Sequence, residues 1–185
     1  MKKERRSVGL LAQRLDKKRK EYKVISLVRC DDRLIHGQCM TRIVQHFFIK
    51  EIIVVDEYTA ANSLLKSIFE KAVPPGMKAK VVTINEAIEM LPSCMTNDIS
   101  TLVLFKTPLV AVSLFSALKD LADSLMVGPV AMKPTAVEMQ KGTYLTPPEM
   151  EAADQLEEMG VTVYFQVVPG QKRFDWKDLR TKVKR

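Results

Sequence analysis

Eight consecutive positions carry an unusual density of chemically active side chains: Asp31, Asp32, Arg33, Leu34, Ile35, His36, Gly37 and Gln38. Two carboxylates, a guanidinium, an imidazole and a carboxamide so close together are uncommon in a purely structural loop. Histidine is nucleophilic near neutral pH because its unperturbed pKa of about 6.5 leaves one ring nitrogen with a lone pair. The segment therefore predicts that His36 accepts a phosphoryl group on a ring nitrogen.

The neighbours of His36 are suited to assist such a transfer. A carboxylate from Asp31 or Asp32 would hold the proton of the other ring nitrogen and so select the tautomer. Arg33 offers a fork of N–H donors for the transferred oxygens. The alternative is a loop histidine that only caps a helix or forms a hydrogen bond. The charged neighbours favour the nucleophile.

Gly37 and Gln38 lead from this segment into a predicted helix. Gly37 lets the backbone approach an anion closely, and the amides that open the helix add partial positive charge. Gln38 adds a side-chain amide to the predicted phosphate site. The second histidine, His46, lies in an apolar-rich helical stretch, where a structural role is expected.

A second polar loop follows the predicted strand that ends at residue 105. Lys106 and Thr107 would line the same site from the neighbouring strand, as a positive charge and a phosphate ligand. Thr107 precedes Pro108 and is equally suited to be a helix N-cap, so both roles stay open. Asp56 and Glu57, which follow another strand, predict a turn.

Hydrophobic periodicity predicts an α/β fold. Short β-branched runs predict strands over residues 24–28, 52–55, 80–84, 101–105, 124–127 and 161–165. Helical spacing predicts helices over residues 38–48, 60–72, 85–91, 108–121, 148–159 and 175–183, and residues 129–145 predict a hairpin or an extended excursion. This alternation predicts a single domain with a mainly parallel open sheet and helices on both faces. Ligands bind such sheets beyond the carboxyl ends of the strands, where both polar loops lie.

Length and charge argue against a membrane-spanning protein and against a nucleic-acid-binding protein. The 185 residues, 46% of them hydrophobic, suit one globular domain, and the longest uncharged stretch, residues 159–171, is shorter than the roughly 20 residues that span a bilayer. Residues 1–23 contain ten Lys or Arg and three acids, so they carry the whole net charge of +7. The remainder is neutral, which argues against nucleic-acid binding. Residues 1–22 are expected to form a basic N-terminal extension, flexible or a short helix, before a domain at residues 23–185.

Several other chemistries find no support. The sequence contains no dinucleotide fingerprint, no Walker-type phosphate loop and no GxSxG elbow. Two histidines and three scattered cysteines make no recognisable metal site, so neither a metal nor a cofactor is expected. The odd number of cysteines fits reduced thiols in a cytoplasm.

The run from Arg29 to Gln38 closely resembles the signature R-[IV]-D-[DE]-R-L-[IV]-H-G-Q of IIB components of the sugar phosphotransferase system, in the mannose/fructose/sorbose family. The likeness covers roughly residues 23–180 and includes residues 52–57, 73–76 and 104–108, Gly128, and residues 167–169. Cys30 and Cys39 stand where the family usually has aliphatic residues. As buried small apolar side chains they are conservative replacements; the alternative is that a thiol three residues from His36 makes activity sensitive to oxidation.

The resemblance implies a function and partners. In this family the histidine that matches His36 takes a phosphoryl group from the phosphohistidine of a IIA component and passes it to a sugar presented by the membrane components IIC and IID. It implies a parallel α/β sheet and a cytoplasmic protein held peripherally at the inner face of the membrane by its partners. The sugar, the phosphorylated ring nitrogen and the formation of a homo-oligomer stay open.

Two other classes of function compete with the phosphocarrier. The first is a regulatory or binding module that keeps the fold without transferring phosphate, and the intact signature argues against it. The second is an adaptor that uses residues 1–22 to bind a membrane surface or a nucleic acid. The neutrality of residues 24–185 argues against that class.

Overall fold

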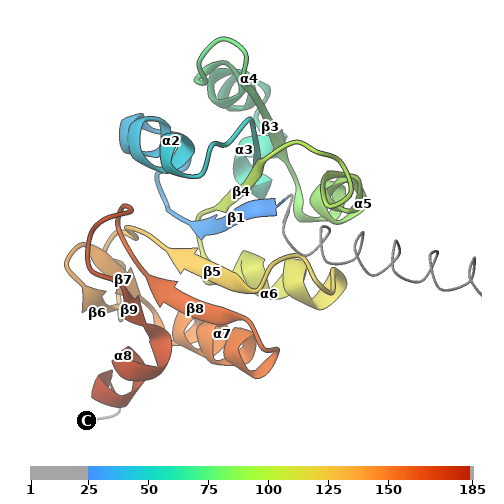
Figure 1. Cartoon of the computed structure of the whole chain (residues 1–185). Coiled ribbons are helices and arrows are strands. Elements are labelled where there is room, and N and C mark those ends of the chain that lie inside the picture. The colour runs from blue at the N-terminus through green and yellow to red at the C-terminus, as the bar shows by residue number, and fades with distance from the viewer. Residues whose placement is uncertain (1–24, 184–185) are drawn as a thin grey trace, which may run out of the picture.

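A seven-stranded sheet forms the centre of the protein (Figure 1). The computed structural model describes residues 25–183. The strands of this sheet are β1 (Ile25–Cys30), β2 (Glu51–Val55), β3 (Lys78–Val82), β4 (Thr101–Phe105), β5 (Ser124–Val127), β8 (Thr162–Phe165) and β9 (Phe174–Asp175). Their order is β3-β2-β4-β1-β5-β8-β9, and all neighbours pair in parallel except β8 and β9. The predicted α/β class and mainly parallel sheet are confirmed.

Burial explains which strands lie in the middle. Every residue of β2 and of β4 is buried, because these strands are covered by helices on both faces. The edge strand β3 instead exposes Lys78 and Lys80. Charged side chains on an edge strand oppose pairing with another chain.

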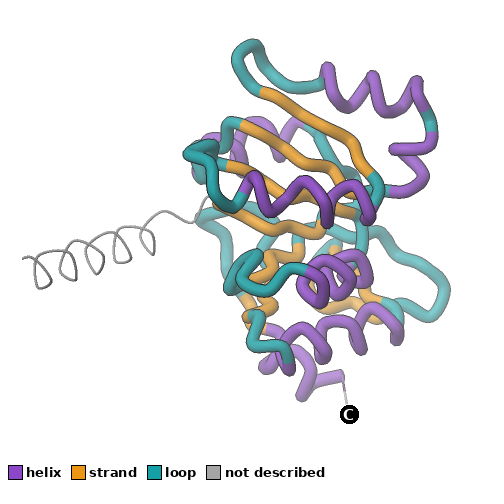
Figure 2. Tube along the Cα trace, turned by 90° about the vertical axis from the view of Figure 1, so that its right-hand side faces the viewer, coloured by secondary structure: helices purple, strands orange, loops and turns teal. Residues whose placement is uncertain are grey.

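Helices cover both faces of the sheet, as predicted (Figure 2). The helical elements are η1 (Cys39–Ile43), α2 (Val44–His46), α3 (Glu57–Ala61), α4 (Ser63–Lys71), α5 (Ile84–Cys94), α6 (Pro108–Ala117), α7 (Pro147–Glu158) and α8 (Trp176–Val183). One apolar cluster joins α5, α6, α7 and α8 to the sheet, through Leu91, Leu114, Leu156 and Trp176 among others. The other cluster lies on the opposite face and contains Ile43 of η1.

Capping side chains correct three element boundaries. The single helix predicted over residues 60–72 is two helices, because Asn62 has extended dihedral angles and its Oδ1 accepts from the amide of Leu65, 3.0 Å away. Asp56 caps α3, so Asp56 and Glu57 open a helix and the predicted turn was wrong. Thr83 caps α5, and β3 therefore ends at Val82 instead of residue 84.

The segment 129–145 contains a small hairpin. Its strands β6 (Val137–Gln140) and β7 (Thr143–Leu145) pair antiparallel, which confirms the predicted hairpin. The hydroxyl of Thr143 donates to the carbonyl of Gly128 at 3.1 Å and ties the hairpin to the end of β5. Among residues 25–183, no helix is long and apolar enough to cross a bilayer. The predicted extension, residues 1–22, lies outside the described residues.

Candidate phosphoryl-transfer site

The loops after β1 and β4 meet at the carboxyl edge of the sheet. The two strands are neighbours, Cys30 lies opposite Phe105, and the amide of Asp31 donates to the carbonyl of Phe105 at 2.9 Å. The chain leaves β1 toward η1 on one face and leaves β4 toward α6 on the other. Neighbouring parallel strands with following helices on opposite faces create a crevice in which ligands bind. The polar segment 31–38 follows β1 at this point of the sheet edge.

A tight turn sets the position of His36. The amide of Leu34 donates to the carbonyl of Asp31 at 3.0 Å, and Leu34 adopts a left-handed conformation with φ of 54°. Residues with a branched side chain seldom adopt this conformation, so the sequence did not predict it. The carbonyl oxygen of Leu34 lies 2.8 Å from Nδ1 of His36. The turn therefore aims a backbone acceptor at the imidazole ring.

Each nitrogen of the His36 ring faces an oxygen atom. Nδ1 contacts the carbonyl of Leu34, and Nε2 lies 3.9 Å from Oδ2 of Asp31. Nε2 is buried and has no hydrogen-bond partner among the described residues. A nucleophilic nitrogen needs a free lone pair and access to the phosphoryl donor. Because Nε2 is buried, acceptance of a phosphoryl group at Nε2 requires a movement that exposes this nitrogen.

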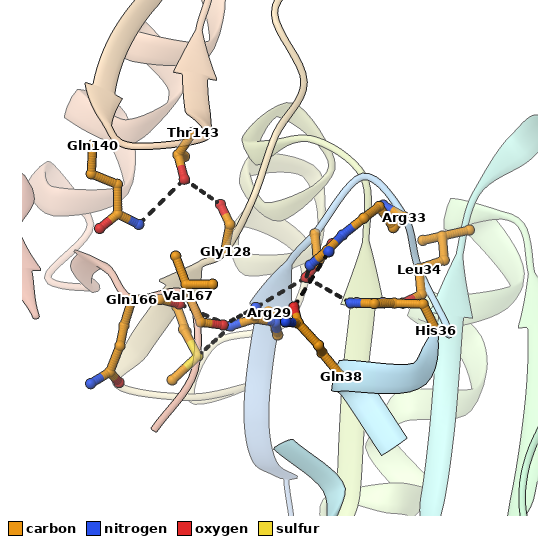
Figure 3. Close-up of polar contacts among 12 residues, drawn as sticks. Arg29, Arg33, Leu34, His36, Gln38, Gly128, Gln140, Thr143, Gln166 and Val167 are labelled. Carbon is orange, nitrogen blue, oxygen red and sulfur yellow. Dashed lines mark hydrogen bonds and ion pairs between the residues drawn. The ribbon is translucent and has the colours of Figure 1, made fainter. Parts of the chain in front are cut away.

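Asp31 binds two arginines and faces the histidine. Figure 3 labels these three partners, Arg29, Arg33 and His36. Its carboxylate is fully buried, and its Oδ1 lies 3.1 Å from Nε of Arg33. Oδ2 accepts from Nη2 of Arg33 at 3.1 Å and from Nη2 of Arg29 at 3.0 Å. The side chain of Arg33 is 41% exposed, whereas that of Arg29 is 1% exposed. Arg33 can thus reach solvent from the same carboxylate that lies beside His36.

Asp32 binds the backbone of another loop. Its Oδ2 accepts from the amide of Ala131 at 2.6 Å, and its own amide donates to the carbonyl of Pro129 at 3.2 Å. Asp32 therefore ties the segment 31–38 to the loop after β5. Of the two carboxylates considered for orienting His36, Asp31 is the one that faces the ring.

Gly37 and Gln38 begin the helical conformation that continues into η1. Gly37 is exposed, and a Cβ atom added there would meet no atom within 4 Å, so the space beside its backbone is open. Oε1 of Gln38 lies 3.5 Å from Nη1 of Arg33. The helix predicted over residues 38–48 includes a π-helical segment, Cys39–Ile43, and ends at His46, which is exposed. Such wide turns are frequent at functional sites.

Cys39 begins the π-helical segment and is buried. Burial raises the pKa of its thiol to about 11. The protonated form is unreactive toward oxidants because the thiolate is the nucleophile. The burial of Cys39 favours its role as a small apolar side chain over a role in oxidation sensitivity.

Lys106 and Thr107 follow β4 and bind acidic partners. Nζ of Lys106 lies 2.7 Å from Oδ2 of Asp56, and the hydroxyl of Thr107 donates to Oε1 of Glu149 at 2.9 Å. Thr107 also caps α6 through the amide of Leu109. Within the described residues no hydrogen bond or ion pair joins Lys106 or Thr107 to His36.

Two carboxylates of this edge have a lowered pKa. Burial opposes ionisation of Asp56, but the hydrogen bonds from Lys106 and Thr59 outweigh it and lower its pKa. Burial likewise opposes ionisation of Glu149, and bonds from Lys133, Thr146 and Thr107 lower the pKa of Glu149. Both groups are therefore charged at neutral pH and hold their partners in place.

Sequence reasoning missed two residues of this site, Arg29 and Glu149. Arg29 lies inside the apolar strand β1, and a cation in a buried strand was the available signal. Glu149 is the third residue of α7, and its position in the sequence predicts only a capping role. Its contact with Thr107 depends on the tertiary structure. In the described part of the chain, no group of three or more His, Cys, Asp or Glu side chains is placed to hold a metal ion.

The fold and this edge define an α/β protein with a histidine-bearing site at the switch point of a parallel sheet. A family model described as the PTS system sorbose subfamily IIB component matches residues 25–185. The chain therefore belongs to the sorbose subfamily of phosphotransferase-system IIB components. Components of this family are phosphotransferases that act in sugar uptake.

Individual relatives agree with this assignment. The sorbose-specific EIIB component of Klebsiella pneumoniae is 28% identical over 144 residues, which cover 78% of this chain and 87% of the relative. The mannose-specific EIIAB component of Escherichia coli (strain K12) is 28% identical over 163 residues, which cover 88% of this chain and 50% of that longer relative. The crystal structure of the IIBSor domain of the Klebsiella pneumoniae sorbose permease is 25% identical, with a TM-score of 0.78 over 85% of this chain and 96% of that domain.

Proposed function

We propose that this protein is a phosphocarrier that accepts a phosphoryl group on His36 from a phosphorylated IIA component and transfers it to a sugar. The observation that carries the proposal is the placement of the imidazole at the carboxyl edge of the sheet, beside the buried Asp31 and the exposed Arg33. We take residues 23–185 as the phosphocarrier domain. The matched region, residues 25–185, supports these limits.

The chemistry consists of two displacements at phosphorus. In the first, the lone pair of a His36 ring nitrogen forms a P–N bond while the P–N bond to the donor histidine breaks, and its electron pair returns to the donor ring. In the second, a sugar hydroxyl oxygen forms a P–O bond while the bond to His36 breaks, and the hydroxyl proton replaces the phosphoryl group on the imidazole. Such transfers depend on positioning and charge stabilisation.

Arg33 is the cation best placed to stabilise the transferred phosphoryl oxygens. Its guanidinium is partly exposed and lies on the carboxylate that faces His36, so a small movement brings it to the phosphoryl group. The open backbone at Gly37 and the side-chain amide of Gln38, which contacts Arg33, add donors near His36. Lys106 and Thr107 contribute less, because Asp56 and Glu149 hold them in the free protein.

The partners follow from the family and its relatives. A relative that is a mannose-specific EIIAB component contains a IIA part together with the IIB part in one chain, which supports a IIA protein as the phosphoryl donor. The matched structure is a domain of a sorbose permease, which supports a membrane partner, IIC with IID, that presents the sugar. We propose that the protein works in the cytoplasm at the inner face of the membrane, held there by these partners.

Phosphoryl transfer to sugar tests this function directly. The purified protein would be incubated with phosphoenolpyruvate, the two general phosphotransferase proteins, a mannose-family IIA and membranes that contain IIC and IID, and sugar phosphate would be measured. Formation of sugar phosphate that depends on this protein is the expected result. A folded protein that binds IIA and neither gains nor passes on phosphate would instead be a binding module.

A further inference from the structure

The two arginines that bind Asp31 differ in burial, and we infer that they have different roles in phosphoryl transfer. Arg29 is a positioning residue that holds and neutralises Asp31 throughout the cycle, whereas Arg33 leaves Asp31 to bind the phosphoryl group on His36. This inference rests on the proposed function. The juxtaposition that carries it is the buried carboxylate of Asp31, which contacts one buried and one exposed guanidinium and lies 3.9 Å from His36.

Arg29 is fixed on every side. Its Nη2 donates to Asp31 at 3.0 Å and to the carbonyl of Val167 at 2.8 Å, and its Nη1 donates to the carbonyl of Gln166 at 3.2 Å. Nη1 also contacts the sulfur of Met126. These bonds join the end of β1 to the loop after β8. With a side chain that is 1% exposed, Arg29 has no path to a phosphoryl group on the surface.

Gly128 makes room for the Arg29 guanidinium. A Cβ atom at residue 128 would clash with Nη2 of Arg29 and lie 2.6 Å from its Cζ, so any larger residue would displace the guanidinium. The amide of Gly128 donates to the carbonyl of Cys30 at 2.7 Å, so its backbone is fixed as well. Gly128 therefore sets the position of Arg29 from the side opposite His36.

Stability alone does not explain this arrangement. A buried ion pair seldom stabilises a fold more than apolar residues of the same volume, because both charges lose their hydration. The Nε of Arg29 also has no hydrogen-bond partner among the described residues. The arrangement does have a consequence for transfer: with Arg29 in place, departure of Arg33 leaves Asp31 paired rather than buried and alone. Arg33 can then exchange between Asp31 and a phosphoryl group at low cost.

The test compares Arg29→Lys and Gly128→Ala with Arg33→Ala. A lysine ammonium cannot reproduce the planar fork that holds Asp31 and two carbonyls, and Gly128→Ala shifts Arg29 without removing any charge. We expect both changes to alter the ¹⁵N chemical shifts of the unphosphorylated His36 ring and to slow transfer from phospho-IIA about 10²-fold. Arg33→Ala should change those chemical shifts less than either of these variants and still slow transfer. Circular dichroism and cooperative unfolding would verify folding.

Arg180→Lys is the matched control. Arg180 of α8 pairs with Asp154 of α7 at 2.8 Å, on the face of the sheet opposite η1. Its replacement should change neither the His36 spectrum nor the transfer rate. Folded Arg29→Lys and Gly128→Ala proteins with the wild-type His36 spectrum and rate would overturn the inference. The inference would also be overturned if Arg33→Ala changed the His36 spectrum as strongly as Arg29→Lys and Gly128→Ala do.

Two further measurements distinguish a failure of this inference from a failure of the proposed function or of folding. In the wild-type protein, phosphorylation should shift the guanidinium ¹⁵N resonances of Arg33 and leave those of Arg29 unchanged. Shifted Arg29 resonances with unchanged Arg33 resonances would overturn the inference. If the wild-type protein accepts no phosphate, the proposed function fails. The effect of Arg29→Lys and Gly128→Ala on the His36 spectrum would still decide whether Arg29 positions the site.

Discussion

Oδ2 of Asp31 lies 3.9 Å from Nε2 of His36, and the carboxylate is fully buried. Of the two neighbouring carboxylates, that of Asp31 therefore faces the imidazole, while that of Asp32 binds the backbone of the loop after β5. This relationship places His36 beside the carboxylate that Arg29 and Arg33 hold.

Arg33→Ala should slow phosphoryl transfer by about 10²-fold, because it removes the exposed cation next to His36. Since Arg29 still pairs with Asp31, the variant should fold with a free energy of unfolding within about 1 kcal/mol of wild type. Quenched-flow transfer from phospho-IIA measures the rate. Arg42→Ala, at an exposed arginine of η1, serves as the control, and an Arg33→Ala rate equal to that of the control would remove Arg33 from the site.

Lys106→Met and Thr107→Val should each slow transfer less than about threefold, because both side chains bind acidic partners in the free protein. Thr107→Val should also lower the free energy of unfolding by about 1 kcal/mol, since it removes the cap of α6. Denaturation and transfer assays on the same samples separate the two effects. A loss of transfer as large as that of Arg33→Ala would show that Thr107 or Lys106 binds the phosphoryl group directly.

Glu149→Gln should lower the free energy of unfolding at pH 7 by about 1–3 kcal/mol, because buried Glu149 accepts bonds from Lys133, Thr146 and Thr107. Its pKa in the folded protein is lowered below the unfolded value of about 4.3. The stabilisation is therefore complete above that value and is lost as pH falls through the folded pKa.

Urea unfolding at several pH values between 7 and 3 tests this pH dependence. The difference between wild type and Glu149→Gln should shrink as the pH drops below about 4. Glu151→Gln, at an exposed position of the same helix, should change the stability little at any pH. A Glu149→Gln effect that is constant from pH 7 to pH 3 would contradict the lowered pKa.

Cys39 should resist alkylation in the folded protein, because burial keeps its thiol pKa at about 11 and closes access. Iodoacetamide at pH 8 should label it only after unfolding in urea, as read by peptide mass spectrometry. Mild peroxide should leave phosphoryl transfer unchanged. Rapid labelling of the native protein would show that the segment after His36 opens.

Most of the fold could be predicted because its strands are apolar on both faces and its helices have regular spacing. β4, fully buried and bounded by Thr101 and Phe105, matches its predicted limits. The errors lie where one side chain ends an element. Asn62 divides a continuous helical pattern into two helices, and Thr83 ends β3 by capping α5. Periodicity does not register a single hydrogen bond of this kind.

The candidate site was predictable as a set of residue types but not as a network. The run from Asp31 to Gln38 indicated the segment correctly, yet sequence spacing could not tell which carboxylate faces His36. The left-handed Leu34 and the buried contacts of Arg29 depend on tertiary packing. Lys106 lies on the predicted edge but binds Asp56, a partner 50 positions away in sequence.

The most direct test of the phosphocarrier is the intact mass of His36→Ala and His46→Ala beside wild type. Each protein would be incubated with phosphoenolpyruvate, the two general phosphotransferase proteins and a mannose-family IIA, and weighed before and after mild acid. Wild type and His46→Ala, which lacks only an exposed histidine, should gain one acid-labile phosphoryl group, and folded His36→Ala should gain none. Phosphate on His36→Ala, or none on wild type with a working IIA, would contradict the account.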